Sequence, residues 1–206
     1  MNILFIGDIF GRPGRNLLAS HLSDLVSRHA VDLVVANGEN AAAGFGITPR
    51  LTEELLALDI DVLTSGNHIW DRKEILEYLP RESRLLRPAN YPGELGHGAY
   101  LGKTRGGVEY AVINLQGRVF MASTDCPFRT ADRELEKLPS SCKIRIVDIH
   151  RGRRGHSRGA ARHDQERQRR LVRARHERHS VRLDWRRSRL ASGRGLRGQP
   201  QRPRGG

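Results

Sequence analysis

The amino-acid composition changes abruptly after residue 150, and this break limits which part of the chain can fold. Residues 151–206 contain 19 arginines, no lysine and four acidic residues, whereas residues 1–150 contain 17 basic and 19 acidic residues. The later segment has only six Leu, Ile, Val or Phe residues, too few to offset the conformational entropy lost on folding. We therefore predict a folded region in residues 1–150 and a disordered, Arg- and Gly-rich tail in residues 151–206.

The sequence carries no sign of secretion or membrane insertion. No stretch approaches the roughly 18 consecutive apolar residues that span a bilayer. The first apolar run, in MNILFIGDIF, follows no basic segment and precedes no small-residue cleavage site, so it does not match a signal peptide. Two cysteines, Cys126 and Cys142, are too few for a disulfide framework. We predict a cytoplasmic protein with no membrane partner.

Short apolar runs alternate with amphipathic stretches along residues 1–150. The pattern predicts strands at 2–7, 31–36, 60–65, 109–115 and 143–149, and helices at 15–28, 48–58, 71–79 and 131–138. Thr48 is the predicted N-cap and Pro49 the first residue of the second helix. Beyond residue 80, Gly- and Pro-rich loops are predicted up to residue 108. The alternation predicts an α/β fold with parallel strands joined by right-handed crossovers.

Polar side chains follow four of the predicted strands. They are Asp8 after the first, Asn37, Glu39 and Asn40 after the second, Asn67 and His68 after the third, and His150 after the last. Ligands of open α/β sheets bind at the carboxyl ends of the strands. Carboxylate, amide and imidazole groups suit Mn, Fe or Zn, and a carboxylate such as Glu39 can bridge two ions that clamp a phosphate. Their joint occurrence favours a metal site.

Each of these residues, taken alone, also has a structural interpretation. Asp8 can cap a turn, and Glu39 and Asn40 lie in a loop-forming Asn-Gly-Glu-Asn segment. A single histidine such as His68 is more often structural than a ligand. The metal-site interpretation therefore depends on the set of residues and not on any one of them.

Three glycines, Gly7, Gly38 and Gly66, lie within two residues of the candidate ligands. We expect the backbone there to need a positive φ or to approach a bound ion closely, which glycine allows. The sequence contains neither the GxxxxGK[ST] motif of P-loop proteins nor a GxSxG nucleophile elbow, which argues against both classes of enzyme.

Seven segments carry a resemblance to a known family. In order, they are GDIFGRPGR, NGENAAAGFGIT, SGNHIWD, LLRPANYP, INLQGRVFM, PFR and VDIH. This series closely resembles the YmdB-like metallophosphoesterases, bacterial members of the calcineurin-like phosphoesterase superfamily, over essentially all of residues 1–150. The resemblance implies a four-layer αββα sandwich around two sheets, incomplete in this chain. It also implies hydrolysis of 2′,3′-cyclic nucleotides or related phosphoesters, with looser phosphatase activity, by a cytoplasmic homo-oligomer.

The same resemblance implies roles for six residues around a dinuclear Fe or Mn centre. Asp8, Glu39 and Asn40 correspond to ligands of the first metal, with Glu39 bridging, and Asn67 and His150 to ligands of the second. His68 corresponds to the proton donor to the leaving ribose oxygen, opposite the attack of metal-activated hydroxide on phosphorus.

The resemblance stops after residue 150. The family continues after VDIH into a Gly-Thr-His-Thr-His motif whose two histidines complete the metals, and residues 151–206 contain no such motif. A basic arm selected for phosphate contacts usually mixes Lys with Arg, whereas GC-rich DNA translated out of frame tends to give Arg, Gly, Ala and Pro. We therefore predict a shifted reading frame. The literal chain should be severely impaired, because metal binding is coupled to folding and to catalysis.

Two other interpretations remain open. The arginine-rich tail can be an RNA-binding arm that acts through counterion release, or the chain can be a non-functional product that lacks the later strands of its second sheet. The aromatic residues Phe45, Trp70 and Tyr91 can contact a nucleotide base or pack within the fold, and packing is the commoner role.

Overall fold

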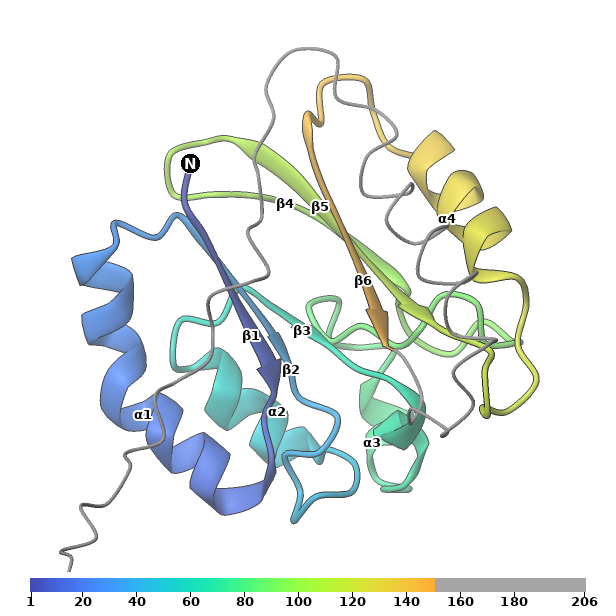
Figure 1. Ribbon diagram of the computed structural model, residues 1–206, viewed down its shortest axis with the longest axis horizontal. Coiled ribbons are helices and arrows are strands. Elements are labelled where there is room, and N and C mark those ends of the chain that lie inside the picture. Colours follow the sequence, from blue (N-terminus) through green and yellow to red (C-terminus); the bar gives the residue numbers. More distant parts are fainter. Residues whose placement is uncertain (151–206) are drawn as a thin grey trace, which may run out of the picture. The chain divides into compact units, whose positions relative to one another are not determined.

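The computed structural model describes residues 1–150 of the chain (Figure 1). Its elements, in order, are β1 (Ile3–Asp8), α1 (Gly11–Arg28), β2 (Leu33–Asn37), α2 (Pro49–Leu56), β3 (Val62–Thr64), the 3₁₀ helix η1 (Asn67–Trp70), α3 (Ile75–Tyr78), β4 (Ala99–Lys103), β5 (Glu109–Gln116), α4 (Pro127–Glu136) and β6 (Ile144–His150). The predicted disorder of residues 151–206 lies outside the described residues.

The strands form two three-stranded sheets. The first has the order β1-β2-β3 and is parallel throughout. The second has the order β4-β5-β6, in which β5 and β6 are parallel and β4 and β5 are antiparallel. The predicted parallel pairing is therefore confirmed for every pair except the one that contains β4.

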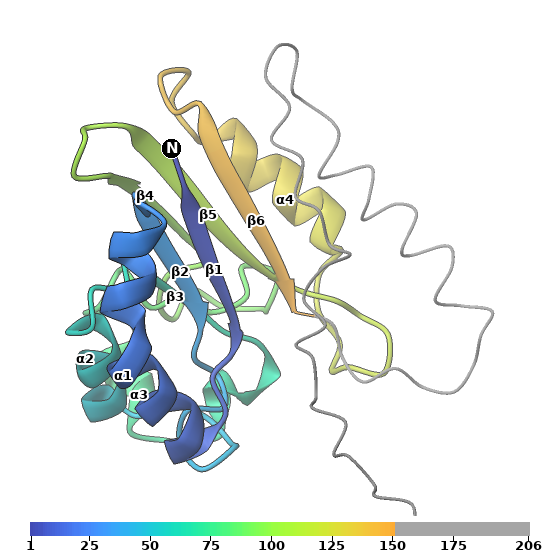
Figure 2. The same ribbon diagram turned by 60° about the vertical axis from the view of Figure 1, so that its left-hand side comes forward.

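The two sheets pack face to face through side chains of their inner surfaces. Leu33, Val35 and Val62 of the first sheet contact Tyr110 and Val112 of the second. Because side chains alternate along a strand, the intervening residues of β2 face the helices instead. Figure 2 shows α1, α2 and α3 outside the first sheet and α4 outside the second. The predicted four-layer αββα arrangement is confirmed.

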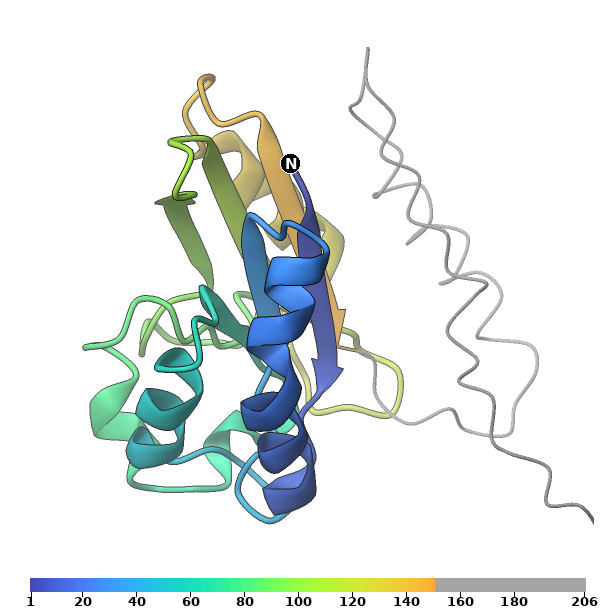
Figure 3. The same cartoon turned by 90° about the vertical axis from the view of Figure 1, so that its left-hand side faces the viewer.

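The helices cover the outer faces of the sheets with separate apolar clusters. Leu22 of α1 and Leu55 of α2 pack with Val34 of the first sheet. Ala131 of α4 packs with Ile113 of the second sheet. Figure 3 shows α1 in front of the strands and α4 behind them. No helix within residues 1–150 is long and apolar enough to cross a membrane.

Helix α1 begins at Gly11, four residues before the predicted start. The segment 11–14 contains two glycines and a proline, which weaken the helical signal there. Pro13 is tolerated because the first turn of a helix has no backbone acceptors for its N–H groups. Gly11 itself has a φ of 55°. The sequence pattern therefore missed the first four residues of α1, because the glycines and the proline that weaken the helical signal are tolerated in the first turn.

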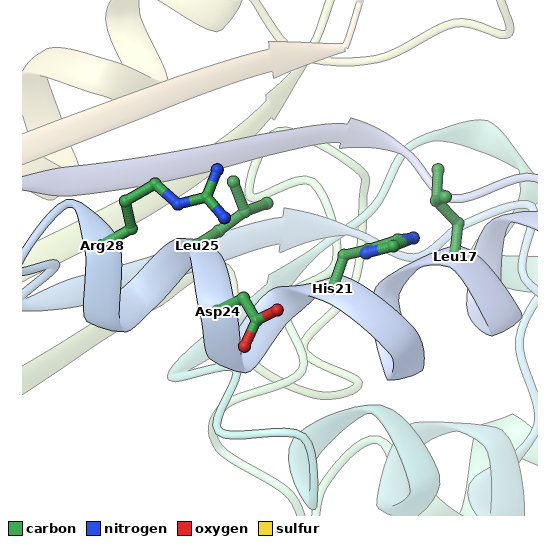
Figure 4. A pocket seen from close by; sticks show the side chains of 5 residues that line it. All are labelled: Leu17, His21, Asp24, Leu25 and Arg28. Atoms are coloured by element: carbon green, nitrogen blue, oxygen red, sulfur yellow. The ribbon is translucent and has the colours of Figure 1, made fainter.

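Only part of the predicted apolar stripe of α1 faces the core. Leu18, Leu22 and Val26 belong to the core cluster of the first sheet. Leu17 and Leu25 are exposed. With His21, Asp24 and Arg28 they line an open pocket of about 300 Å³ along the helix (Figure 4).

Strand β4 lies in a segment that was predicted as loops, and that prediction is wrong. It has five residues and contains Gly102, and a short run with an internal glycine is a weak strand signal. The antiparallel register with β5, which aligns Tyr100 with Val112, holds it in the sheet. Neighbouring strands in the tertiary structure therefore stabilise a strand that its own sequence does not predict.

The start of α2 is as predicted. Thr48 has an extended backbone, and its Oγ1 accepts a hydrogen bond of 3.2 Å from the backbone N–H of Leu51. Pro49 is the first helical residue, where the absence of an N–H costs nothing. Helix α2 thereby begins at a defined residue directly after the loop that carries Glu39 and Asn40.

Replacing Thr48 with alanine removes this cap and should lower the free energy of unfolding by about 1 kcal/mol. Thr48→Ser keeps the hydroxyl and should retain most of the stability. Urea denaturation of the 206-residue chain followed by circular dichroism measures both. Equal stability of the alanine and serine variants would show that the hydroxyl contributes nothing.

Candidate functional site

The predicted site residues lie at the carboxyl ends of four strands. Asp8 is the last residue of β1, Glu39 and Asn40 follow β2, Asn67 and His68 begin η1 after β3, and His150 is the last residue of β6. The first sheet is parallel, so its three strands end at one edge. Figure 1 shows the end of β6 at the same edge. The predicted strands 2–7 and 143–149 stopped one residue early, so Asp8 and His150 end their strands instead of following them.

The five predicted ligand residues lie near one another in two hydrogen-bonded groups, and the charges of Glu39 and His150 both act on Asp8. Asn40 Nδ2 donates a hydrogen bond of 2.8 Å to Asp8 Oδ2. Glu39 Oε1 lies 2.9 Å from His150 Nδ1. On the other side of the imidazole, His150 Nε2 lies 3.1 Å from Asn67 Oδ1. Residues from opposite ends of the folded region therefore share one site.

His68 is adjacent to this cluster and is oriented by two carboxylates. Its backbone N–H donates to Glu39 Oε2 at 3.3 Å. Its Nδ1 lies 2.6 Å from Asp71 Oδ2, so the Asp71 carboxylate accepts a hydrogen bond from Nδ1–H. The other ring nitrogen, Nε2, is then the one that remains for a substrate. The sequence prediction missed Asp71. The signal available was its spacing of three residues from His68, which places both on one side of a helical turn.

Gly66 allows the two sheets to approach each other at the site. A Cβ atom on Gly66 would collide with the His150 ring and with the Glu39 carboxylate. The backbone at this glycine is therefore closely approached by two side chains of the site. Gly7 has no such neighbours, since a Cβ there would meet no atom of the described residues within 4 Å. None of Gly7, Gly38 and Gly66 is among the described glycines with positive φ, so of the two predicted alternatives only the approach to a bound ion stays open, as a prediction.

The site brings acidic groups together, of which Glu39 is buried, Asp148 half-buried and Asp8 more exposed. Burial raises the pKa of Asp8, although the hydrogen bond from Asn40 opposes the shift. Burial also raises the pKa of Asp148, which lies two residues before His150 on the same face of β6. Burial disfavours the charged form of His150, but the neighbouring Glu39 carboxylate outweighs it, so the pKa of His150 is raised. Crowded carboxylates of this kind favour a cation between them.

Asp148 is a second residue that the sequence prediction missed. In residues 1–150 its Oδ2 is a buried oxygen without a hydrogen-bond partner, and the same is true of Asn40 Oδ1. A buried polar atom without a partner is costly. The signal for Asp148 was its place in VDIH, because residues two apart on a strand share a face.

The donor set fits a hard or borderline metal ion, although no complete site is formed. Carboxylate and amide oxygens with one imidazole suit Mn or Fe, and the buried oxygen Asn40 Oδ1 lacks a partner in the described region. Within residues 1–150, no three His, Cys, Asp or Glu side chains are arranged to hold one ion. Two of the five predicted ligands are asparagines, and two of the others, Glu39 and His150, contact each other directly. The ligand roles therefore stay predictions.

A buried amide holds the backbone next to Gly66. Asn114 of β5 is fully buried, and its Nδ2 donates to the carbonyl oxygens of Ser65 at 2.9 Å and Leu86 at 3.1 Å. Ser65 Oγ donates to the same Leu86 oxygen at 2.6 Å. The second sheet therefore fixes the backbone that precedes Asn67 and His68.

The fold is shared with a phosphatase of known structure. A crystal structure described as a novel phosphatase of Mycoplasma pneumoniae superposes with a TM-score of 0.67 at 29% identity, over 73% of this chain and 55% of the other. A hypothetical protein from Thermus thermophilus superposes with a TM-score of 0.67 at 38% identity, over 74% of this chain and 59% of the other.

The family follows from the sequence comparison. Residues 4–154 match the family model described as YmdB-like protein, and the chain belongs to this family. It is 40% identical over 151 residues to the 2′,3′-cyclic-nucleotide 2′-phosphodiesterase of Bacillus subtilis (strain 168), and 32% identical over 159 residues to a putative phosphatase/phosphodiesterase of Mycoplasma genitalium. The matches cover 73% of this chain but only 57% and 55% of those proteins. The chain thus spans little more than half the length of these relatives.

Replacing Gly66 with alanine should disrupt the site, because the new methyl group must displace the His150 ring or the Glu39 carboxylate. Overpacking of this kind costs about 1–3 kcal/mol. Gly7→Ala, at a glycine with open space, is the matched control. Thermal unfolding of both variants measures the difference, and a Gly66→Ala variant as stable as Gly7→Ala would contradict the close approach.

Proposed function

We propose that this chain is the N-terminal part of a metal-dependent phosphoesterase that hydrolyses 2′,3′-cyclic nucleotides or related phosphoesters. The observation that carries the proposal is the meeting of Asp8, Glu39, Asn40, Asn67 and His150 in one cluster beside His68. Membership of the YmdB-like family supports it, as does the printed activity of the Bacillus subtilis relative.

The cluster suits two metal ions, for which Fe or Mn is the best match. Asp8, Glu39 and Asn40 would hold the first, and Asn67 and His150 the second. Glu39 would bridge the two ions, since its charge acts on Asp8 of the first group and its Oε1 lies 2.9 Å from His150 Nδ1 of the second. When bound, such ions supply positive charge for the phosphate oxygens and activate water near neutral pH.

His68 would donate the proton to the leaving ribose oxygen. Asp71 holds Nδ1, so Nε2 is the ring nitrogen that can reach a substrate. The hydrogen bond between the His68 backbone and Glu39 fixes the proton donor relative to the proposed ligands. Correct placement of a general acid contributes to the rate because the proton must move as the bond breaks.

Residues 151–206 would be the product of a shifted reading frame, and the literal chain would have low activity. The match to the family model ends at residue 154, close to the change in composition. The two histidines that complete the metals in the family have no counterpart in this sequence. The predicted RNA-binding arm lies wholly in the segment outside the described residues. A cytoplasmic location and a homo-oligomer are part of the same proposal.

Replacing Glu39 with glutamine tests the metal site directly. The variant keeps the shape of the side chain but loses the charge, and Mn²⁺ affinity of the 206-residue chain should fall by at least about 10-fold. Glu53→Gln, on the exposed face of α2, is the control and should bind Mn²⁺ as the parent chain does. Isothermal titration measures all three, and equal affinities would exclude Glu39 as a ligand.

Sequencing the gene across the codon for His150 tests the proposed frame. Another forward frame should continue VDIH into an apolar strand and a His-Thr-His segment. The protein made in that frame should hydrolyse 2′,3′-cyclic AMP. Turnover by the 206-residue chain should be at least about 10-fold slower, because losing a metal ligand lowers activity at least as much as losing a residue that supports a ligand. Two bound metals and equal turnover in the 206-residue chain would contradict the predicted impairment.

A further inference from the structure

One aromatic side chain beside His68 is held out of the core. Phe45 lies in the loop between β2 and α2, and 58% of its surface is exposed. Its neighbours Gly44, Gly46 and Ile47 are all buried. The loop therefore packs its backbone and leaves the phenylalanine ring in solvent. A single exposed apolar side chain is common on protein surfaces, so exposure alone does not indicate a function for Phe45. Its neighbours in the structure do.

The backbone that carries this ring is tightly fixed. Arg72 donates from Nε to the carbonyl oxygen of Phe45 at 3.0 Å and from Nη2 to that of Ala42 at 3.1 Å. Arg15 donates to the carbonyl oxygen of Ala41. Three carbonyl groups of the loop are thereby satisfied by two guanidinium groups. The exposed ring of Phe45 is therefore carried by a loop whose backbone is held in place by hydrogen bonds.

Both glycines beside Phe45 are required by the backbone. Gly44 has a φ of 91° and Gly46 a φ of 80°, a region that other residues rarely adopt. A Cβ on Gly44 would lie 2.7 Å from the ring of Phe10, and a Cβ on Gly46 would lie 2.7 Å from Arg72 Cγ. The loop conformation that presents Phe45 is thus fixed by dihedral angle and by space.

The ring lies next to the proposed proton donor. The centroids of the Phe45 and His68 rings are 5.4 Å apart, with the planes at 78°. If Nε2 of His68 serves the leaving ribose oxygen, the sugar lies against His68 and the base extends one sugar ring further. The exposed face of Phe45 is within that reach. Aromatic side chains bind bases by stacking, which tolerates different bases because each has a π-face.

The other two aromatic candidates have a packing partner instead. Trp70 and Tyr91 contact each other edge to face, with centroids 5.5 Å apart, and both are half-buried. Packing accounts for both rings. Of the three aromatic residues that the sequence left open, Phe45 alone combines contact with His68 and an exposed face.

We infer that Phe45 is the stacking platform for the base of a nucleotide substrate and therefore a specificity-determining residue. The inference rests on the proposed function, since it places the ribose at His68. It implies that the site prefers nucleoside cyclic phosphates over cyclic phosphates without a base, and purines over pyrimidines, because larger bases stack more strongly.

Equilibrium binding to the 206-residue chain in the presence of Mn²⁺ tests the inference with two probes, 2′,3′-cyclic AMP and glycerol 1,2-cyclic phosphate. Phe45→Ala should weaken binding of cyclic AMP by roughly 5- to 100-fold and leave the glycerol compound unchanged. Phe45→Tyr should retain the preference. Val108→Ala, at an exposed apolar residue in the β4–β5 turn, is the control and should bind both probes as the parent chain does.

The outcomes separate this inference from the proposed function. Binding of both probes with equal affinity, or an equal loss of both in Phe45→Ala, overturns the role of Phe45 and leaves a phosphoester site intact. Both probes are also measured with the protein made in the frame that continues VDIH, because the 206-residue chain is expected to be impaired. Failure of both proteins to bind either probe overturns the proposed function, and the inference with it. Loss of self-association in Phe45→Ala, measured by sedimentation, with unchanged binding of cyclic AMP would place the ring in a protein interface and also overturn the inference.

Discussion

The contact between Glu39 and His150 across the bare backbone of Gly66 is the constraint on which the site depends. Glu39 follows a strand of the first sheet, and His150 ends the edge strand of the second. Their side chains approach to 2.9 Å only because Gly66 has no Cβ. The sandwich core brings the sheets together over an apolar surface, and this polar contact joins the strand ends together with the contact between His150 Nε2 and Asn67 Oδ1. Asn114 supports it by binding the backbone of Ser65.

Electrostatics explain why such a site favours a cation. Burial raises the pKa of Asp8 and of Asp148, and the carboxylates of Glu39, Asp148 and Asp8 all raise the pKa of His150. Buried negative charges are stable only when they are paired, and the protonated form of His150 compensates one of them. In the described region, the buried oxygens Asn40 Oδ1 and Asp148 Oδ2 have no hydrogen-bond partner and are acceptors that a metal ion would satisfy. The family to which the chain belongs and the geometry of its strand ends therefore support the same chemistry.

Sequence patterns predicted the strands that are buried on both faces and the residues at their ends. β2 and β5 are nearly continuous apolar runs, so their position and their parallel partners followed from the pattern. Strand β4 did not, because its five residues are stabilised by pairing with β5. The start of α1 was missed for a different reason, since glycine and proline predict loops unless the first helical turn is considered. Asp71 and Asp148 were missed because their importance comes from neighbours that lie elsewhere in the fold.

The sequence by itself determined the strands other than β4, the main helices, the family, and the set of polar groups at the strand ends, because hydrophobic periodicity and local motifs are properties of short segments. The tertiary structure alone decided that Gly66, and not Gly7, is the glycine the site requires, and that Phe45 is exposed beside His68 while Trp70 packs against Tyr91. These features depend on distances between residues remote in the chain. Such distances are set by the packing of two sheets, which no local pattern encodes.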